Sequence, residues 1–172
     1  MKTDRKTKVE KSPPRVKAVK RRGRASPKIN GKYPLAYEYI PVGIVEASLD
    51  GKYIDVNEEF SRILGHSRQE LLGQSIKDFT HEDDYAIDFR LYEQLISGKI
   101  PFYKLEKRYI RKGGEIIWVE LTRSLVCDSK EKPLSTVAVV LDISDRKDVE
   151  KVLRDSVERL RLATGAAQMF MW

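Results

Sequence analysis

The side chains best suited to chemistry are few in this chain, which holds one cysteine, Cys127, and two histidines, His66 and His81. A single thiol excludes both an intramolecular disulfide and a zinc site built on several cysteines. Cys127 is predicted at the end of a strand beside a polar turn, so we interpret it as a half-buried structural thiol. His66 and His81 are predicted at the starts of helices, where capping or surface roles are expected in preference to metal ligation.

The larger catalytic patterns are missing from the sequence. It contains no glycine-rich loop of the phosphate-binding kind, and no Ser/His/Asp or Cys/His set in a context that supports nucleophilic catalysis. Neither histidine has the surroundings of a kinase phosphoacceptor helix. We therefore expect no catalytic machinery in this chain.

Arg123 is a charged residue on an otherwise apolar strand face. That face is predicted from strict alternation and carries Ile117, Val119, Leu121 and Leu125. A buried guanidinium needs a partner, because an unpaired charge in the interior is very costly. Arg123 could hold a carboxylate ligand through two parallel hydrogen bonds. Alternatively, the strand end frays and Arg123 reaches solvent or pairs with a glutamate; we favour this second arrangement.

The elements that position these residues begin with a hairpin. Two short apolar runs within 43–54 are joined at Asp50-Gly51, the strongest short-range hairpin signal. A helix is predicted over 58–64, because Asn57 supplies an N-cap and Gly65 suits the position after the helix end. The apolar face of this helix carries Phe60, Ile63 and Leu64.

Two further helices are expected from capping patterns. Ser67 and Glu70 form a capping box for a helix of one turn. Thr80 with Asp83 repeats the pattern at the start of a longer helix that ends at Gly98. The longer helix carries apolar residues at a spacing of four, namely Ile87, Leu91 and Leu95.

Three strands are predicted in the second half. Pro101 opens a strand that runs through Ile110, and Gly113-Gly114 marks a hairpin turn. Residues 115–126 and 135–143 form the remaining strands. Two strands, several short helices and three antiparallel strands indicate an α+β fold with one five-stranded antiparallel sheet.

The hydrophobic period changes after residue 143 and predicts a long helix, with Ser144 as a candidate N-cap. Spacings of four and three then alternate, as in a coiled-coil seam. The seam positions are Val149, Leu153, Ser156, Leu160, Ala163 and Ala167. The alternative is an ordinary amphipathic helix packed on its own domain. We favour the coiled coil, because the seam continues past the domain and charged residues cover the other faces.

Charge divides the chain into two parts. Residues 1–32 hold thirteen Lys/Arg against two Asp/Glu, a net of +11, so the other residues carry −4 and the whole chain +7. This stretch has almost no large apolar side chains and is expected to be a disordered tail. A phosphate-binding arm for nucleic acid or anionic lipid is the alternative. With no run of transmembrane length and no secretory signal, we expect a cytoplasmic protein.

In the order and spacing of its motifs, the span from about Tyr39 to Lys147 resembles a PAS domain with its C-terminal PAC half. The matching segments are Pro41 to Ile44, the Asp-Gly hairpin, Asn57 to Ser67, Glu70 to Gly73, His81 to Asp84, Arg108 to Gly114, Trp118-Val119 and Asp142 to Lys147. The last of these resembles the family's closing Asp-Ile-Thr signature, with serine for threonine. The final stretch, 159–172, resembles the opening of a second PAS domain.

The resemblance implies a division of the chain and a place for a ligand. It implies a PAS domain over 33–145, a coiled-coil signalling helix over 146–163 and the truncated start of a second PAS domain over 164–172. The candidate pocket residues are Phe60, Leu64, Phe89, Val119, Leu121 and Arg123.

The same resemblance bears on cofactors. Light-sensing flavin members of the family carry a reactive cysteine on a helix near the middle, and haem-binding members carry a histidine on the long helix. Residues 83–97 contain neither residue type. We therefore expect no haem, no covalent flavin chemistry, and either no ligand or a small one of unknown identity.

The resemblance finally implies a sensory and dimerisation module of a multi-domain signalling protein, of the sensor histidine kinase or diguanylate cyclase type. A signal would reach an output domain through the residues that start the last helix, Asp142, Ser144 and Arg146. The resemblance also implies that Asp142 accepts hydrogen bonds at this exit or pairs with Arg146. Two copies would meet through Ile116, Trp118, Val149, Leu153 and Leu160. The rival functions are a pure protein-interaction domain with its interior filled by its own side chains, and a nucleic-acid-binding regulator that uses the basic tail.

Overall fold

The computed structural model describes residues 40–169, with side-chain surroundings given as far as Leu162. The expected basic tail and residues 170–172 lie outside the described residues, as do the side chains of Ala163 and Ala167. The elements are β1 (Gly43–Ala47), β2 (Tyr53–Val56), α2 (Glu58–Leu64), α3 (Arg68–Leu71), α4 (Ile76–Phe79), α5 (Glu82–Ile96), β3 (Phe102–Ile110), β4 (Ile116–Cys127), β5 (Pro133–Asp142) and α6 (Ser144–Met169).

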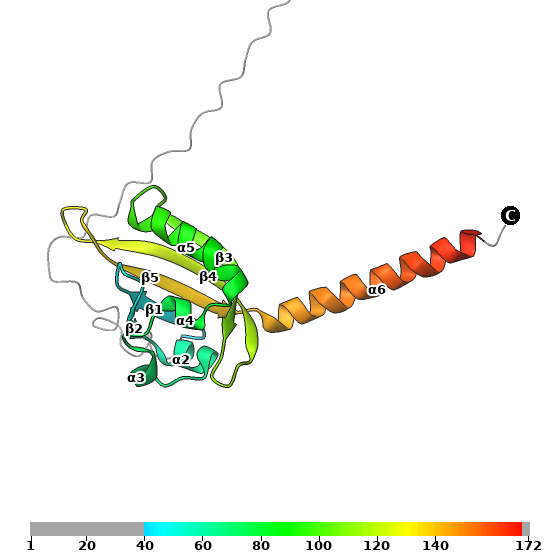
Figure 1. Cartoon of the computed structure of the whole chain (residues 1–172), viewed down its shortest axis with the longest axis horizontal. Coiled ribbons are helices and arrows are strands. Elements are labelled where there is room, and N and C mark those ends of the chain that lie inside the picture. The colour runs from blue at the N-terminus through cyan, green and yellow to red at the C-terminus, as the bar shows by residue number, and fades with distance from the viewer. Residues whose placement is uncertain (1–39, 170–172) are drawn as a thin grey trace, which may run out of the picture.

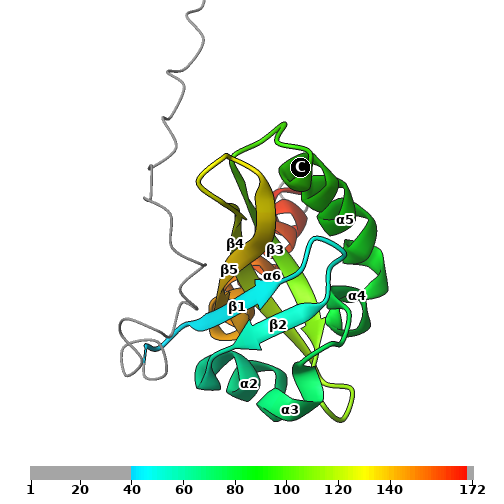
Figure 2. The same cartoon turned by 90° about the vertical axis from the view of Figure 1, so that its left-hand side faces the viewer.

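The five strands form one antiparallel sheet in the order β2-β1-β5-β4-β3 (Figure 2), which confirms the expected fold class. Neighbours along the chain pair as hairpins on each side of the sheet. The two sides join where β1 pairs with β5, with Val45 opposite Ala138. As a result, the strand that leads into α6 lies in the middle of the sheet and has a hydrogen-bonded neighbour on both edges.

The Asp-Gly hairpin and the helix after it form as the sequence predicts. Gly51 has a φ of +80°, a conformation that glycine adopts without steric cost. Asn57 caps α2 by accepting a hydrogen bond from the Phe60 N–H at 3.0 Å. Its side chain also accepts from the Ile44 N–H at 2.8 Å and donates to the Val42 carbonyl at 3.0 Å. One buried asparagine therefore caps the helix and fixes it to β1.

Helices α2 to α5 lie against one face of the sheet, and the hydrophobic core fills the space between (Figures 1 and 2). The residues of the core come from both layers, and include Val45, Val56, Phe60, Leu64, Leu71, Leu95, Tyr109, Val119, Leu121 and Val140. Burial of these side chains supplies the main favourable free energy of folding.

The structure corrects the predicted start of the long helix. Ser67 and Glu70 form their capping box as expected. Thr80 caps the end of α4, a helix of one turn that the sequence analysis did not predict, and its hydroxyl donates to the Ile76 carbonyl. The N-cap of α5 is His81, whose ring accepts a hydrogen bond from the Asp83 N–H at 3.3 Å.

The buried face of α5 also differs from the prediction. Ile87 was expected inside but is 51% exposed, while Asp88, Tyr92 and Leu95 are buried. The core-facing stripe of the helix therefore includes a carboxylate. The spacing of apolar residues along the helix does not reveal such a stripe. The buried carboxylate is compensated by a residue that is distant in sequence.

The second face of the sheet and the last helix are exposed to solvent. Ile116, Val139 and Leu141 are exposed on that face, and α6 projects away from the domain (Figure 1). Within the described residues, no helix is both long enough and apolar enough to span a membrane.

Candidate functional site

The structure brings most of the predicted pocket residues together as packed core. Phe60, Leu64, Val119 and Leu121 are fully buried. Phe60 makes edge-on ring contacts with Tyr53 at 5.5 Å and with Tyr109 at 6.3 Å between centroids. These residues form the apolar wall of the interior between helices and sheet.

Phe89 does not belong to this wall. It is 45% exposed and stacks on Tyr85 with 5.7 Å between ring centroids. It follows Asp88 on α5, and because Asp88 faces the core, Phe89 is turned about 100° away toward the side of the helix. Phe89 therefore lies outside the apolar interior, but it does line a pocket, at the surface beside α5.

Arg123 is buried, contrary to the arrangement that the sequence favoured. It is 1% exposed, because β4 continues to Cys127 and does not fray at this point. Its Nη1 donates to the Thr136 hydroxyl at 3.2 Å, and its guanidinium lies 5.3 Å from the centre of the Tyr92 ring. Among the described residues, its Nε and Nη2 atoms have no hydrogen-bond partner.

A buried ion pair lies beside Arg123. Lys107 of β3 and Asp88 of α5 form a salt bridge in which both side chains are almost completely excluded from solvent. Lys107 also donates to the Thr80 hydroxyl at 3.1 Å, and Asp88 accepts from the Tyr103 hydroxyl at 2.8 Å. We name Asp88, Tyr103, Lys107 and Arg123 the polar core.

The electrostatics of the polar core hold Asp88 ionised. Burial by itself raises the pKa of Asp88, but the charge and the hydrogen bond of Lys107 outweigh burial and hold this pKa below its usual value. Burial raises the pKa of Tyr103 far above its usual range. Of the polar core, only Arg123 was singled out from the sequence. Lys107 gave a signal too, because it falls on the inward side of a strand, at alternating positions between Tyr103 and Tyr109.

A pocket of about 260 Å³ opens beside the polar core. It lies between α5, the β1–β2 turn and α4, and its wall includes Leu49, Ile76, Phe89 and Ile96. Asp88 and Tyr92 also line it, and the Tyr92 hydroxyl donates to the Ser48 carbonyl at 2.6 Å. We name this hollow the α5 pocket. An apolar hollow with a few polar groups is the usual form of a small-molecule site.

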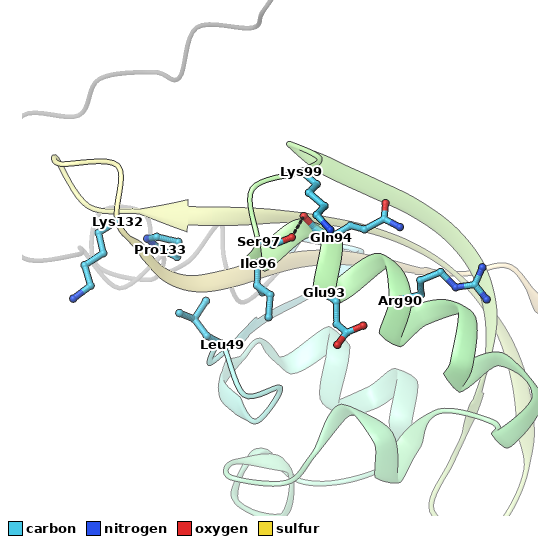
Figure 3. A pocket seen from close by; sticks show the side chains of 9 residues that line it. All are labelled: Leu49, Arg90, Glu93, Gln94, Ile96, Ser97, Lys99, Lys132 and Pro133. Carbon is cyan, nitrogen blue, oxygen red and sulfur yellow. Dashed lines mark hydrogen bonds between the residues drawn. The ribbon is translucent and has the colours of Figure 1, made fainter.

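A wider hollow of about 750 Å³ lies at the C-terminal end of α5 (Figure 3). It is bordered by Leu49 of the β1–β2 turn and by Lys132 and Pro133 at the start of β5. Its basic side chains do not converge, since Arg90 and Lys132 lie at opposite ends and point apart (Figure 3). The α5 pocket is therefore the better candidate for a ligand.

The start of α6 is tied to the domain through Asp142. One carboxylate oxygen accepts from the Ser144 N–H at 2.9 Å, and the other pairs with Nη2 of Arg111 at 3.0 Å. The Nε of Arg111 donates to the Ile63 carbonyl in the last turn of α2 at 2.7 Å. The prediction that Asp142 accepts hydrogen bonds at the exit is confirmed. Arg111 thus joins α2, the end of β5 and the start of α6.

Ser144 and Arg146 have other partners than the sequence suggested. The Ser144 hydroxyl accepts from the Trp118 N–H at 3.1 Å, so it fixes α6 to β4 and does not cap its own helix. Arg146 pairs with Glu106 at 2.6 Å, and Asp142 is not its partner. Hydrogen bonding from Lys147, and then from Arg146, lowers the pKa of Glu106.

The proposed dimer residues are accessible to different degrees. Val149, Leu153 and Leu160 of α6 are 68%, 64% and 65% exposed, and Ile116 of the sheet is also exposed. Trp118 is half-buried, because Arg108 and Lys147 lie 5.4 and 5.1 Å from its ring centre. The structure therefore leaves a helical apolar stripe uncovered, while Trp118 is partly covered by its own chain.

The cysteine and the histidines lie apart from the interior. Cys127 ends β4 and is exposed, so its expected half-burial is wrong. His81 caps α5 as expected. His66 follows α2 and packs edge-on against Phe79 with 5.3 Å between ring centroids.

The comparisons with known proteins agree with this geometry. A family model described as PAS fold matches residues 53–140. The chain is 34% identical over 137 residues to a probable diguanylate cyclase, DgcE, of Escherichia coli K12, a match that spans 80% of this chain and 12% of that protein. It is 25% identical over 139 residues to the sensor histidine kinase TmoS of Ectopseudomonas mendocina, which covers 80% of this chain and 14% of that protein.

A solved structure supports the same fold. The sensory box histidine kinase/response regulator of Burkholderia thailandensis superposes with a TM-score of 0.60 at 25% identity, covering 75% of this chain and 97% of that one. The chain thus spans about an eighth of the length of the two curated relatives, and nearly all of the chain in the solved structure.

Proposed function

The chain belongs to the PAS family, and from this membership we propose that it is the sensory and dimerisation module of a larger cytoplasmic signalling protein. It is related to the PAS domains of diguanylate cyclases and sensor histidine kinases. We propose that its output domain is of one of these two types and supplies any catalytic activity. We also retain the hypothesis that residues 164–172 begin a second PAS domain.

The proposed mechanism is mechanical. A ligand or partner changes the packing between helices and sheet, and the change reaches the exit through Arg111, which contacts both the Ile63 carbonyl and Asp142. Because Asp142 also holds the first N–H of α6, a shift of Arg111 alters how that helix leaves the sheet. Coupling of this kind is typically worth about 1–3 kcal/mol, enough to bias a helix pair between two registers.

The observation that carries the proposal is the uncovered apolar stripe of α6. Val149, Leu153 and Leu160 are each about two-thirds exposed, and an isolated helix of this length is marginal in water. A second copy aligned in parallel would cover the stripe and place both output domains on the same side. Exposed Ile116 extends the apolar surface onto the sheet.

Disulfide trapping tests this arrangement. In a Cys127→Ser background, Leu153→Cys should cross-link two copies on mild oxidation, because seam residues of a parallel pair face their own equivalents. Lys151→Cys, nearly opposite on the helix, is the matched control and should cross-link far less. Equal cross-linking of the two variants, or none in either, would reject the parallel seam.

A second candidate function is a pure protein-interaction domain, favoured by the tight filling of the interior by Phe60, Leu64, Val119 and Leu121. In that case the exposed sheet residues Ile116, Val139 and Leu141 would contact the partner. Ligand-independent dimerisation with no small-molecule response would support it. Nucleic-acid binding remains a separate hypothesis, tested by salt-dependent DNA binding that disappears on deletion of residues 1–32.

A further inference from the structure

The polar core contains a positive charge with no anion of its own. Arg123 is 1% exposed and forms no ion pair within the part of the chain that the structure describes. Asp88 already accepts from Tyr103 with one oxygen and from Lys107 with the other. Two buried cations and one buried anion leave the polar core with a net charge of +1. A buried charge of this kind is strongly unfavourable unless something compensates it.

The unused donors of Arg123 share one edge of its guanidinium. Nη1 is bound to the Thr136 hydroxyl, and the free nitrogens are Nε and Nη2. In a guanidinium, the Nε and Nη2 hydrogens point to the same side in parallel, the arrangement that matches the two oxygens of a carboxylate. The free edge can therefore donate two parallel hydrogen bonds to the same ligand group.

Further hydrogen-bonding capacity is unused in the same interior. The hydroxyls of Tyr53 and Tyr109 are buried and, within the described residues, have no hydrogen-bonding group near them other than each other. Both lie within electrostatic reach of Arg123. Most buried polar groups in proteins are paired, so the two unpaired nitrogens of the buried Arg123 guanidinium call for an acceptor beside them.

The α5 pocket borders this interior through Asp88 and Tyr92. Its apolar wall leads to Asp88 and Tyr92, and the Tyr92 ring lies over the guanidinium of Arg123. Tyr92 is held to the β1–β2 turn by the single hydrogen bond from its hydroxyl to the Ser48 carbonyl. A ligand in the pocket would reach the free edge of Arg123 only if the Tyr92 side chain turned away from the guanidinium.

We propose that the interior binds a small carboxylate, whose two oxygens accept from Nε and Nη2 of Arg123 and whose apolar remainder occupies the α5 pocket. The pocket volume of about 260 Å³ restricts the ligand to a few carbon atoms or one ring. A single excess positive charge favours a monoanion over a phosphate dianion. The pocket wall carries Asp50 and Glu93 against one cation, Lys77, and therefore disfavours a second acidic group. This inference rests on the proposed function and names the signal that the module would sense.

The test uses the full 172-residue chain and pairs of matched small molecules. Melting temperature and calorimetric affinity are measured with acetate, propionate, butyrate and benzoate, each against its neutral amide, with chloride and phosphate at equal ionic strength. We expect at least one carboxylate to raise the melting temperature and to bind at least tenfold more tightly than its amide. No response to any carboxylate at 10 mM, an equal response to acid and amide, or a response to chloride or phosphate alone would overturn the proposal.

The variant Arg123→Met should abolish the response and still fold, since it replaces an uncompensated buried charge with an apolar chain of similar length. The control Arg90→Met, on the outer side of α5, should respond as the wild type does. If Arg123→Met fails to fold, the Arg Nε–H resonance in the nuclear magnetic resonance spectrum of the wild type decides the matter. Titration with the carboxylate must shift the Arg123 signal, and an unshifted signal would refute direct contact.

The outcome is independent of the dimer test. A chain that forms the Leu153→Cys cross-link but ignores all carboxylates would refute only the ligand. A chain that binds a carboxylate through Arg123 but shows no parallel seam would refute only the proposed relay through α6.

Discussion

The substitution Asp88→Asn removes the negative charge of the buried pair with Lys107 while it keeps the shape of the side chain. Lys107 has no solvent exposure, so its ammonium group cannot reach water once the carboxylate is gone. The hydrogen bond from the Tyr103 hydroxyl loses its charged acceptor in the same step. The polar core would then hold two cations and no anion.

The expected loss is large for a domain of this size. Breaking a buried ion pair from one side typically costs about 3–5 kcal/mol, and single domains are stable by only about 5–15 kcal/mol. We expect Asp88→Asn to lose about 3 kcal/mol, since the amide oxygen can still accept from Lys107. The matched control is Asp83→Asn on the same helix, whose exposed carboxylate pairs with Arg108 and should cost less than about 1 kcal/mol.

Urea unfolding followed by far-ultraviolet circular dichroism measures both variants. The double substitution Asp88→Leu with Lys107→Met should recover much of the loss, because an apolar pair of similar volume avoids desolvation of both charges. If Asp88→Asn is no less stable than Asp83→Asn, the buried pair contributes no net stability and the reasoning is wrong.

Acid should destabilise the wild type as the pH falls below about 4, because the pKa values of Asp84 and Asp88 are lower in the folded chain than their usual 3.8. The two ionised carboxylates stabilise the folded state above that value, and this stabilisation is lost as the pH falls through their pKa values in the folded chain. A melting temperature that stays constant from pH 6 to pH 2.5 would contradict this. Leu153→Asp should convert a dimer to a monomer in light scattering without unfolding the domain, whereas Lys151→Asp should not; a wild type that is monomeric at about 100 μM would rule out the seam. Asp142→Ala should lose about 1–2 kcal/mol of stability and uncouple sensing from output, and unchanged signalling in a full-length protein would refute its relay role. Purified protein should be colourless, and a haem or flavin absorbance band that persists through gel filtration would refute the cofactor prediction.

Several features of the fold could be read from the sequence because they depend on neighbours along the chain. The β1–β2 hairpin needs Gly51 at a positive φ, and the start of α2 needs Asn57 within three residues of the N–H it caps. The alternation of β4 correctly separates buried Val119 and Leu121 from the outer face. Such signals act over a few residues, so the order of elements, the sheet class and the resemblance to PAS domains follow from them.

The candidate site could be predicted only in part, because its polar contacts join residues far apart in sequence. Lys107 meets Asp88 across 19 positions, and Arg111 meets Asp142 across 31. The sequence suggested Arg146 for Asp142 because Arg146 is near in the chain, but the sheet places Arg111 beside it. Local pattern cannot rank such partners, since any of several arginines could supply the same charge.

The sequence by itself determined every element except the one-turn helix α4, their order, the apolar face of the sheet and the apolar stripe of α6. The tertiary structure decided which charges enter the interior, among them Asp88, Lys107 and Arg123. The physical reason is that the burial of an apolar side chain is favourable in free energy without any partner, because it removes apolar surface from water. A charged residue is buried only when the fold supplies partners for it, and those partners exist only after β1 has paired with β5 and α5 has packed on the sheet.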